Sequence, residues 1–386
     1  MVSFENTEIA FASKTTGALN KAYWLFKLIG NSNVVTVGKS LTEFALKINF
    51  PIKTIIKATI FKQFVGGETI EECESTINKL GQYNIGAILD YSVEGKESEQ
   101  DFDNCAKETL ATIQKAKNNK HIPFCVFKIT GLARFALLEK VSANKTLSET
   151  EKEEFEKVKS RIYIICKSAF ENNIPIFIDA EESWIQQAMD DLADEMMEQF
   201  NKTRVIVYNT FQLYRKDRLD YLKKSHEKAR AKKYLLGAKL VRGAYMEKER
   251  LRAKELAYAS PINDTKTDTD NLYDATLRYC IDHISSIAIC AGSHNEKSSL
   301  LLVELMSKNN IPNNHPHIYF SQLFGMSDHI SFNLAAAGYN VAKYVPYGPV
   351  KEVLPYLIRR AQENTSVKGQ TGRELNLIIK EKKRRS

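Results

Sequence analysis

The sequence of 386 residues lacks the patterns that mark several classes of protein. Its six cysteines form no CxxC pair and lie far apart, which argues against a disulfide framework or a structural zinc site and favours a reducing compartment. No segment approaches the roughly 20 apolar residues of a membrane span. Arginine is absent before Arg134, whereas Glu5 and Glu8 stand near the start, so the arginine-rich, acid-poor pattern of a transit peptide is missing. These absences predict a cytoplasmic protein that does not cross a bilayer.

The sequence lacks a glycine-rich nucleotide-binding loop. No GxGxxG turn follows a predicted strand, and the Gly66-Gly67 pair precedes a predicted helix, which disfavours an open doubly wound sheet. His294 has no second histidine or cysteine at a ligand spacing, so no metal site is expected.

Charge gives little support for a nucleic-acid partner. The formal net charge of +8 comes from lysines spread along the chain, and the only dense basic run lies at 380–385. Such a tail is usually solvated, and a peripheral contact with anionic lipid is the alternative. The 43% hydrophobic and 26% charged residues are ordinary for a globular protein, so a large buried core is expected.

From about residue 85 onward, short β-branched runs alternate with segments of helical period, as in repeated βα units. Eight strands are predicted, at 85–90, 124–130, 174–179, 204–208, 237–242, 286–291, 317–320 and 340–345. Helices are predicted between them, for example at 151–170, 183–200 and 213–234. This number and order favour an α/β fold, a (β/α)8 TIM barrel over residues 85–386.

Residues 1–84 are predicted to form a helical arm or cap that precedes the barrel. Its helices are expected at 18–29, 41–48, 52–64 and 69–81, the last with Thr69 and Glu72 as a capping box. The stretch 259–271, rich in Ser, Pro, Asn, Asp and Thr, is predicted to be a long loop after the fifth strand.

Polar side chains stand at the carboxyl end of most predicted strands, where a βα barrel places its active site. They are Lys128, Asp179, Gln212, Arg242, Tyr245, His294, Asn295, Gln322 and Tyr344. Arg359 and Arg360 follow on a predicted helix, and a guanidinium fork grips a carboxylate through two parallel hydrogen bonds. Gly243 and Ala244 leave the backbone open to close approach by a flat ring. The set indicates a small anionic substrate.

Each of these residues also has a structural explanation. Lys128 can snorkel from a strand edge, although an inward lysine in an apolar strand needs a charge partner or a reaction. Asp179 can cap the helix that begins at 181 or 182. Arg359 can pair with Glu363 one helical turn later. Position alone leaves these alternatives open.

Two segments, Lys-Leu-Val-Arg-Gly-Ala-Tyr (239–245) and Tyr-Leu-Ile-Arg-Arg-Ala-Gln-Glu-Asn (356–364), resemble the signature segments of proline dehydrogenases. Further segments agree in order: Phe-Lys-Ile-Thr (127–130), Ile-Asp-Ala-Glu-Glu (178–182), Asn-Thr-Phe-Gln-Leu-Tyr (209–214), Leu-Phe-Gly-Met-Ser-Asp (323–328) and Lys-Tyr-Val-Pro-Tyr-Gly (343–348). The resemblance implies a distorted (β/α)8 barrel that binds FAD without a Rossmann domain. It also implies oxidation of L-proline to Δ1-pyrroline-5-carboxylate, with the electrons passed to a membrane quinone, in a monofunctional enzyme.

The resemblance further implies roles for individual residues. The proline carboxylate is assigned to Lys128, Arg359 and Arg360. The pyrrolidine ring and the polar groups near it are assigned to Asp179, Tyr245, Leu323 and Tyr344. The implied FAD contacts are Gln212, Lys239, Val241, Gly243, Ala244, Tyr245, Thr265, His294, Asn295 and Glu363.

Two positions bear on the details of this assignment. At position 239 some family members have arginine, whereas Lys239 offers the flavin a single ammonium charge without the paired donors of a guanidinium group. The hydroxyproline-preferring branch tends to lack the tyrosine found here as Tyr344, which favours proline as substrate. The rival functions are hydroxyproline oxidation, a cofactor-free lyase that forms a Schiff base on Lys128, and a non-catalytic carboxylate-binding barrel. The last two leave the ordered motifs unexplained.

Overall fold

A computed structural model describes residues 2–30, 56–92, 97–366 and 370–386, without the side chains at 58, 361–366, 370 and 371. Eight strands close into a barrel in chain order. They are β1 (Ile85–Tyr91), β2 (Phe124–Lys128), β3 (Ile176–Asp179), β4 (Val207–Gln212), β5 (Leu236–Val241), β6 (Ile287–Gly292), β7 (Ile318–Leu323) and β8 (Val341–Tyr347). The predicted α/β barrel is confirmed.

Helices precede and alternate with the strands. Those before β1 are α1 (Thr7–Ala10), α2 (Thr16–Ile29), the π-helical turn η1 (Lys57–Phe61), α5 (Lys62–Phe64) and α6 (Glu74–Gly81). Those up to β5 are α7 (Glu99–Lys117), the 3-10 turn η2 (Ile129–Gly131), α8 (Phe135–Ser142), α9 (Glu149–Glu171), α10 (Ser183–Phe200) and α11 (Arg218–Ala231). The rest are α12 (Met246–Glu255), α13 (Lys266–Asp282), α14 (Glu296–Lys308), α15 (Asp328–Ala336), α16 (Val350–Ser366) and α17 (Gln370–Arg385).

The chain divides into two compact units, which are described separately. Unit 1 combines Met1–Val93 with Gln322–Ser386, and unit 2 is Glu94–Ser321. In unit 2 the strands β2 to β6 pair in parallel with their neighbours, and α7, α10 and α13 pack on β2, β4 and β6. The aromatic rings of Phe124, Phe177, Tyr208 and Tyr319, from β2, β3, β4 and β7, pack against one another, with the first two stacked at 4.4 Å between centroids. We call these four rings the aromatic floor.

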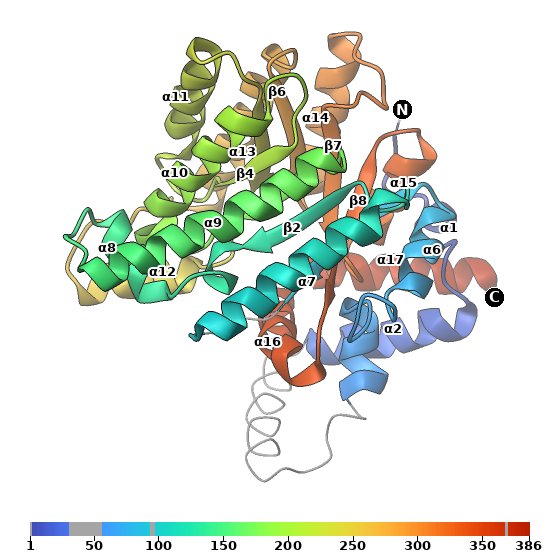
Figure 1. Cartoon of the computed structure of the whole chain (residues 1–386). Helices are drawn as coiled ribbons and strands as arrows, with labels where there is room; N and C mark the ends of the chain where they lie inside the picture. Colours follow the sequence, from blue (N-terminus) through green and yellow to red (C-terminus); the bar gives the residue numbers. More distant parts are fainter. Residues whose placement is uncertain (1, 31–55, 93–96, 367–369) are drawn as a thin grey trace. The chain divides into compact units, whose positions relative to one another are not determined.

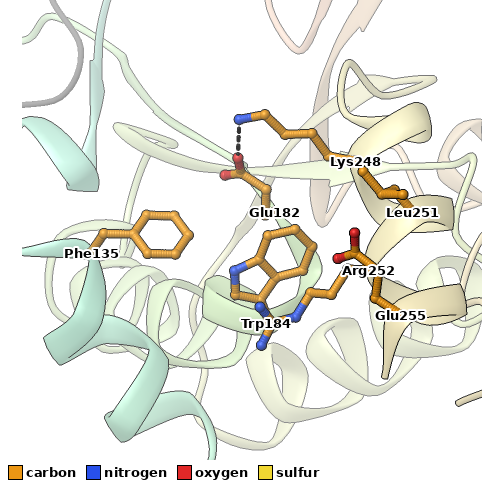
Figure 2. A pocket seen from close by; sticks show the side chains of 7 residues that line it. All are labelled: Phe135, Glu182, Trp184, Lys248, Leu251, Arg252 and Glu255. Carbon is orange, nitrogen blue, oxygen red and sulfur yellow. Dashed lines mark hydrogen bonds and ion pairs between the residues drawn. The ribbon is translucent and has the colours of Figure 1, made fainter. Parts of the chain in front are cut away.

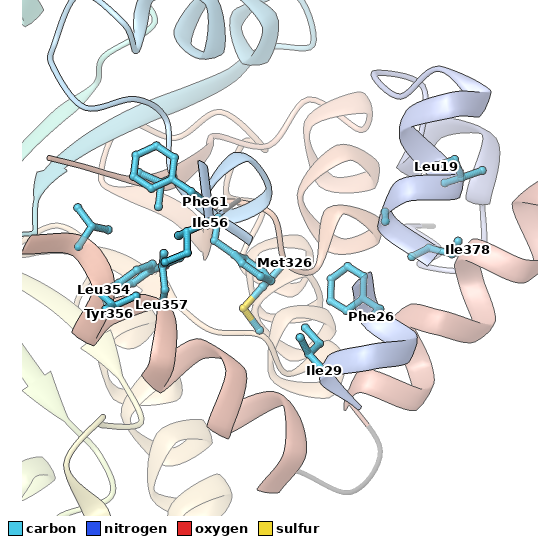
Figure 3. Close-up of a cluster of buried hydrophobic side chains, with 14 of the residues drawn as sticks. Leu19, Phe26, Ile29, Ile56, Phe61, Met326, Leu354, Tyr356, Leu357 and Ile378 are labelled. Atoms are coloured by element: carbon cyan, nitrogen blue, oxygen red, sulfur yellow. The ribbon is translucent and has the colours of Figure 1, made fainter. Parts of the chain in front are cut away.

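In unit 1 the strands β1 and β8 pair in parallel, and the predicted helical arm forms a core with the end of the chain. Figure 3 shows this core, to which α2 contributes Phe26 and Ile29, α16 contributes Leu354 and Leu357, and α17 contributes Ile378. Burial of such side chains stabilises by about 1.5–3 kcal/mol each. The arm therefore supports α16, the helix that carries Arg359 and Arg360.

The structure corrects several predicted boundaries. The predicted strand at 204–208 begins only at Val207, because the side-chain oxygen of Asn201 accepts the backbone N–H groups of Ile206 and Val207 at 2.9 Å. The predicted loop at 259–271 ends at Thr265, which caps α13 in a capping box with Asp268.

The predicted helix at 69–81 begins only at Glu74. Thr69 Oγ1 accepts the backbone N–H of Glu72 as expected, but the Glu72 carboxylate accepts from the N–H of Glu68 and closes a turn. The predicted helix at 41–48 and the start of the one at 52–64 lie outside the described residues.

The basic run at the end of the chain is helical. It forms the last turns of α17, which packs against α2 (Figure 1). Glu381 is fully buried and binds both Arg384 and Arg385, which leaves fewer cations for solvent than the sequence predicts. In the described ranges, no helix has both the length and the apolar character needed to cross a bilayer.

Candidate active site

A layer of charged side chains lies at the carboxyl ends of the strands of unit 2. Lys128 is the last residue of β2 and pairs in register with Asp179, the last residue of β3. Asp179 forms an ion pair with Lys239 of β5, and the two side chains are 13% and 7% exposed. The Lys239 ammonium lies 5.5 Å from the ring of Phe177, so the charged layer sits directly on the aromatic floor. Three of the predicted site residues are thus brought together.

The structure decides one of the alternatives for Asp179. Helix α10 begins at Ser183, with Glu182 in the capping position, so Asp179 is not its cap. Instead Asp179 supplies the counter-charge that a buried ammonium requires.

Sequence reasoning missed Glu181, two residues after Asp179. It is 5% exposed, and its carboxylate accepts hydrogen bonds from the hydroxyl and the N–H of Thr130 at 2.6 and 3.3 Å. Its backbone oxygen accepts from Gln212 Nε2 at 2.6 Å. In the sequence, a carboxyl so close to a predicted helix start is expected to cap that helix. Only its burial in the structure distinguishes Glu181 from an ordinary capping residue.

The end of β5 is held against the end of β4. The carbonyl oxygens of Val241 and Arg242 accept the N–H groups of Leu213 and Tyr214 at 2.8 and 2.7 Å. Gly243 follows with a φ of +126°, and a Cβ at that position would lie 2.5 Å from the ring of Tyr214. Glycine is therefore required here by the fold itself. Ala244 and Tyr245 complete the segment, and Tyr245 stands at the start of α12.

Arg242 and Asn295 link the ends of β5 and β6 to the helices that follow. The Arg242 guanidinium donates to Asp270, Ser293 and Ser298 at 2.7–2.9 Å. Asn295, which follows His294, accepts the first backbone N–H groups of α14 and donates to Asp270 at 3.4 Å. Thr265 has a capping role at α13. These residues therefore shape the rim of the barrel, whatever else they bind.

In unit 1 a buried lysine holds the loop after β7. Lys343 is fully buried, and its ammonium donates to Asp328 at 2.9 Å and to the carbonyl of Met326 at 2.5 Å. Burial favours the neutral form of Asp328, but Lys14 at 3.1 Å and Lys343 outweigh it and hold its pKa far below its usual value. The loop directly follows Leu323, the last residue of β7.

The same loop brings Leu323 next to Tyr344. The N–H of Phe324 donates to the carbonyl of Tyr344 at 2.7 Å. Gly325 has a φ of +78°, and a Cβ there would lie 2.0 Å from the backbone oxygen of Gln63. The helical arm therefore contacts this loop directly. Gln322, inside β7, accepts a hydrogen bond from Ser331.

Arg359 and Arg360 lie on α16, as predicted. Arg360 is 8% exposed, and its guanidinium carbon lies 5.2 Å from the ring centroid of Tyr356, one turn earlier. Arg359 is half-buried. The side chain of Glu363, predicted to contact the cofactor, lies outside the described residues.

A cavity of about 350 Å³ lies between α8, the start of α10 and α12 (Figure 2). It is lined by Phe135, Glu182, Trp184, Lys248, Leu251, Arg252 and Glu255. The Lys248 ammonium lies 2.9 Å from Glu182 and 5.6 Å from the ring centroid of Tyr245. The cavity thus borders the end of the β5 segment, but none of the predicted site residues that the structure describes lines it.

Comparisons with known proteins agree with the sequence motifs. The family model described as proline dehydrogenase matches residues 73–373. Proline dehydrogenase 1, mitochondrial, of Dictyostelium discoideum is 33% identical over 98% of this chain and 74% of its own length. Hydroxyproline dehydrogenase of Xenopus laevis is 33% identical over 86% of this chain and 78% of its own length. The solved structure of proline utilization A from Bdellovibrio bacteriovorus superposes with a TM-score of 0.74 at 19% identity, over 93% of this chain and 38% of that longer one.

Proposed function

The chain belongs to the proline dehydrogenase family, and from this premise we propose that it oxidises L-proline to Δ1-pyrroline-5-carboxylate with FAD as hydride acceptor. The observation that carries the proposal is the charged layer of Lys128, Asp179 and Lys239 on the aromatic floor. It combines a base of packed aromatic rings with the buried ammonium of Lys239 and the half-buried Lys128. This end of the barrel is where enzymes of this fold bind their substrates.

The residues at this end of unit 2 suit a flavin. Lys239 offers a buried ammonium to an electron-rich ring edge, and Gly243 keeps the backbone free of a side chain. We propose flavin contacts by Gln212, Lys239, Val241, Gly243, Ala244, Tyr245, Thr265, His294, Asn295 and Glu363. When bound, FAD supplies the acceptor for a hydride.

The protein's own contribution is to bind and orient proline. We propose that Arg359 and Arg360, with Lys128, bind the carboxylate, since guanidinium groups bind carboxylates through paired hydrogen bonds. Tyr245, Leu323 and Tyr344 then enclose the pyrrolidine ring, with Asp179 orienting the polar groups nearby. Fixing the ring carbon next to the nitrogen removes much of the entropic part of the barrier. The reaction removes a hydride from that carbon and a proton from the nitrogen, so it requires the neutral amine.

The choice between proline and hydroxyproline rests on Tyr344. Relatives named for proline are 28–41% identical to this chain and one named for hydroxyproline is 33% identical, so identity alone does not decide. Tyr344 is 8% exposed, in the register of β8 opposite Ile88. We propose that its bulk disfavours a ring hydroxyl, and that L-proline is the substrate.

The visible spectrum of the purified protein tests the proposal. A yellow flavin band that bleaches when L-proline is added without oxygen is the expected result. Bleaching by hydroxyproline alone would assign the other substrate. A protein that stays colourless after incubation with FAD contradicts the proposal, and borohydride trapping on Lys128 would then test the Schiff-base lyase.

We also propose that the electrons pass to a quinone and that the enzyme reaches it by a peripheral membrane contact. Helix α2 exposes Trp24 by 58% and Leu28 by 52%. The Lys27 ammonium lies 5.0 Å from the ring centroid of Trp24, and the Lys382 ammonium of α17 lies 4.4 Å from that of Tyr23. Exposed aromatic and aliphatic side chains among lysines favour the surface of an anionic bilayer.

A further inference from the structure

Glu181 occupies a central place among the strand ends of unit 2. Its carboxylate binds Thr130 after β2, its backbone N–H donates to Gln186 of α10 at 3.1 Å, and its carbonyl accepts from Gln212 of β4. It lies two residues after Asp179 of β3. A single residue thus ties together the ends of three neighbouring strands.

The charges around Glu181 oppose one another. Burial raises the pKa of its carboxyl to about 7, although the positive charge of Lys128 and the hydrogen bonds from Thr130 act in the other direction. The neighbouring Glu182 raises it slightly, but Glu182 has a partner of its own in Lys248. The pKa of Glu181 thus lies near neutral pH, and its carboxylate is held by Thr130, two residues after the lysine that ends β2.

We propose that Glu181 is a positioning residue that sets, through Lys128, how strongly the site holds the carboxylate of its substrate. The proposal rests on the proposed function, in which Lys128 helps to bind that carboxylate. An ionised Glu181 lowers the positive potential that Lys128 presents to the ligand, whereas a protonated Glu181 does not. Its hydrogen bonds with Thr130 keep the carboxyl in place in both states.

The direction of the pH effect follows from this charge balance. A bound carboxylate repels the ionised form of Glu181, so binding raises the pKa of Glu181 and takes up a proton. Affinity for a carboxylate is therefore highest below pH 7 and falls as pH rises through 7.

The test uses a ligand whose own charge is constant over this range. Tetrahydrofuran-2-carboxylate keeps the five-membered ring and the carboxylate of proline but has no amine to titrate. Its Kd, measured by calorimetry on the flavin-loaded enzyme, should rise about three- to tenfold between pH 6 and pH 8, the range expected for a unit charge several ångströms away. Glu181→Gln should bind it at pH 8 as tightly as the native protein does at pH 6. Its Kd should not change between these two pH values.

Glu182→Gln is the matched control, because it removes the adjacent and equally buried carboxylate, which pairs with Lys248 instead. It should keep the pH step. Thr130→Val is a second variant that leaves the carboxyl intact but removes the hydroxyl donor, and it should move the step to higher pH.

Loss of the step in Glu182→Gln, or its persistence in Glu181→Gln, would overturn the proposal. Should Glu181→Gln fail to fold, an unmoved step in Thr130→Val would overturn it equally. Failure of the proposed function gives a different result. If the protein binds the ligand with this pH dependence but its flavin does not bleach with proline, the proposed oxidation is contradicted and the role of Glu181 stands.

Discussion

At the level of single residues, the ion pair between Asp179 and Lys239 makes the barrel end sensitive to substitution. Both side chains are largely buried. Asp179→Asn removes the carboxylate of this ion pair, and removing one partner of a buried pair costs about 3–5 kcal/mol. We expect the free energy of unfolding, measured by urea denaturation of the flavin-free protein, to fall by about that amount.

The control is a lysine–aspartate ion pair whose side chains are exposed to solvent. Lys216 and Asp264 lie 3.0 Å apart, with side chains 50% and 82% exposed. Lys216→Met should cost no more than about 1 kcal/mol. Equal losses in the two variants would mean that the buried pair contributes nothing beyond an exposed one.

A second residue, His226, makes the folded protein sensitive to acid. Its ring nitrogens lie 2.9 Å from the Tyr279 hydroxyl and 2.8 Å from that of Ser286. Burial, followed by the charges of His283 and Arg230, lowers the pKa of His226 to about 4. The folded state therefore binds fewer protons than the unfolded chain, whose histidine pKa is about 6.5, and stability is lost as pH falls from there toward 4.

Between pH 7 and pH 5 this histidine should remove about 2 kcal/mol from the free energy of unfolding. His226→Gln should flatten the dependence on pH over that interval, while His121→Gln on the partly exposed loop before β2 should retain it. Denaturation with urea at a series of pH values measures both. If the free energy of unfolding of His226→Gln still falls between pH 7 and pH 5, another group causes the acid sensitivity.

Single residues also show how far the sequence could predict the candidate site. Lys128 and Asp179 are identifiable because each ends a strand at the same rim of the barrel. Lys239 lies inside β5, and only the family resemblance indicates it. Glu181 is not identifiable, because its hydrogen bonds with Thr130 and Gln212 depend on contacts between strands that are far apart in the sequence.

At the level of elements, the core of unit 1 connects the first helices to the proposed carboxylate site. Phe26 of α2 is 2% exposed and packs edge-on against Phe64 at 6.2 Å, in the cluster that includes Leu357 of α16. Phe26→Ala should cost about 3–5 kcal/mol of unfolding free energy. Because α16 also carries Arg359 and Arg360, we expect the KM for L-proline to rise as well.

Trp24→Ala on the same helix is the control, since its side chain is exposed and its loss should change stability by no more than about 0.5 kcal/mol. Steady-state kinetics at a temperature where both variants are folded compares their KM values. An unchanged KM in Phe26→Ala would mean that the packing of the helical arm does not affect binding at the proposed site.

Elements were predicted better than their boundaries. All eight strands were found because each is a short apolar run of β-branched residues between helical segments. The start of β4 was misplaced because the side chain of Asn201 accepts the N–H groups of Ile206 and Val207, a contact that the sequence pattern does not show. The start of α13 was missed because Thr265 and Asp268 are typical of loops as well as of capping boxes.

At the level of the whole molecule, the net charge of +8 favours binding to an anionic bilayer. The proposed contact surface comprises Trp24, Leu28 and Lys27 of α2 with Lys382 of α17. The protein should sediment with vesicles of phosphatidylcholine and phosphatidylserine, but not with phosphatidylcholine alone. Binding should weaken steeply with salt, because the Debye length falls from about 10 Å at 0.1 M to about 3 Å at 1 M.

Paired variants locate the contact. Trp24→Ala with Leu28→Ala should weaken vesicle binding by about tenfold or more, since losing even part of the burial of two large apolar side chains costs at least ~1.4 kcal/mol. Leu251→Ala with Leu256→Ala removes two comparably exposed side chains, 57% and 59%, from the region of α12 in unit 2, and should leave binding unchanged. If the second pair abolishes binding and the first does not, the membrane contact lies near α12, and α2 has no part in reaching the quinone.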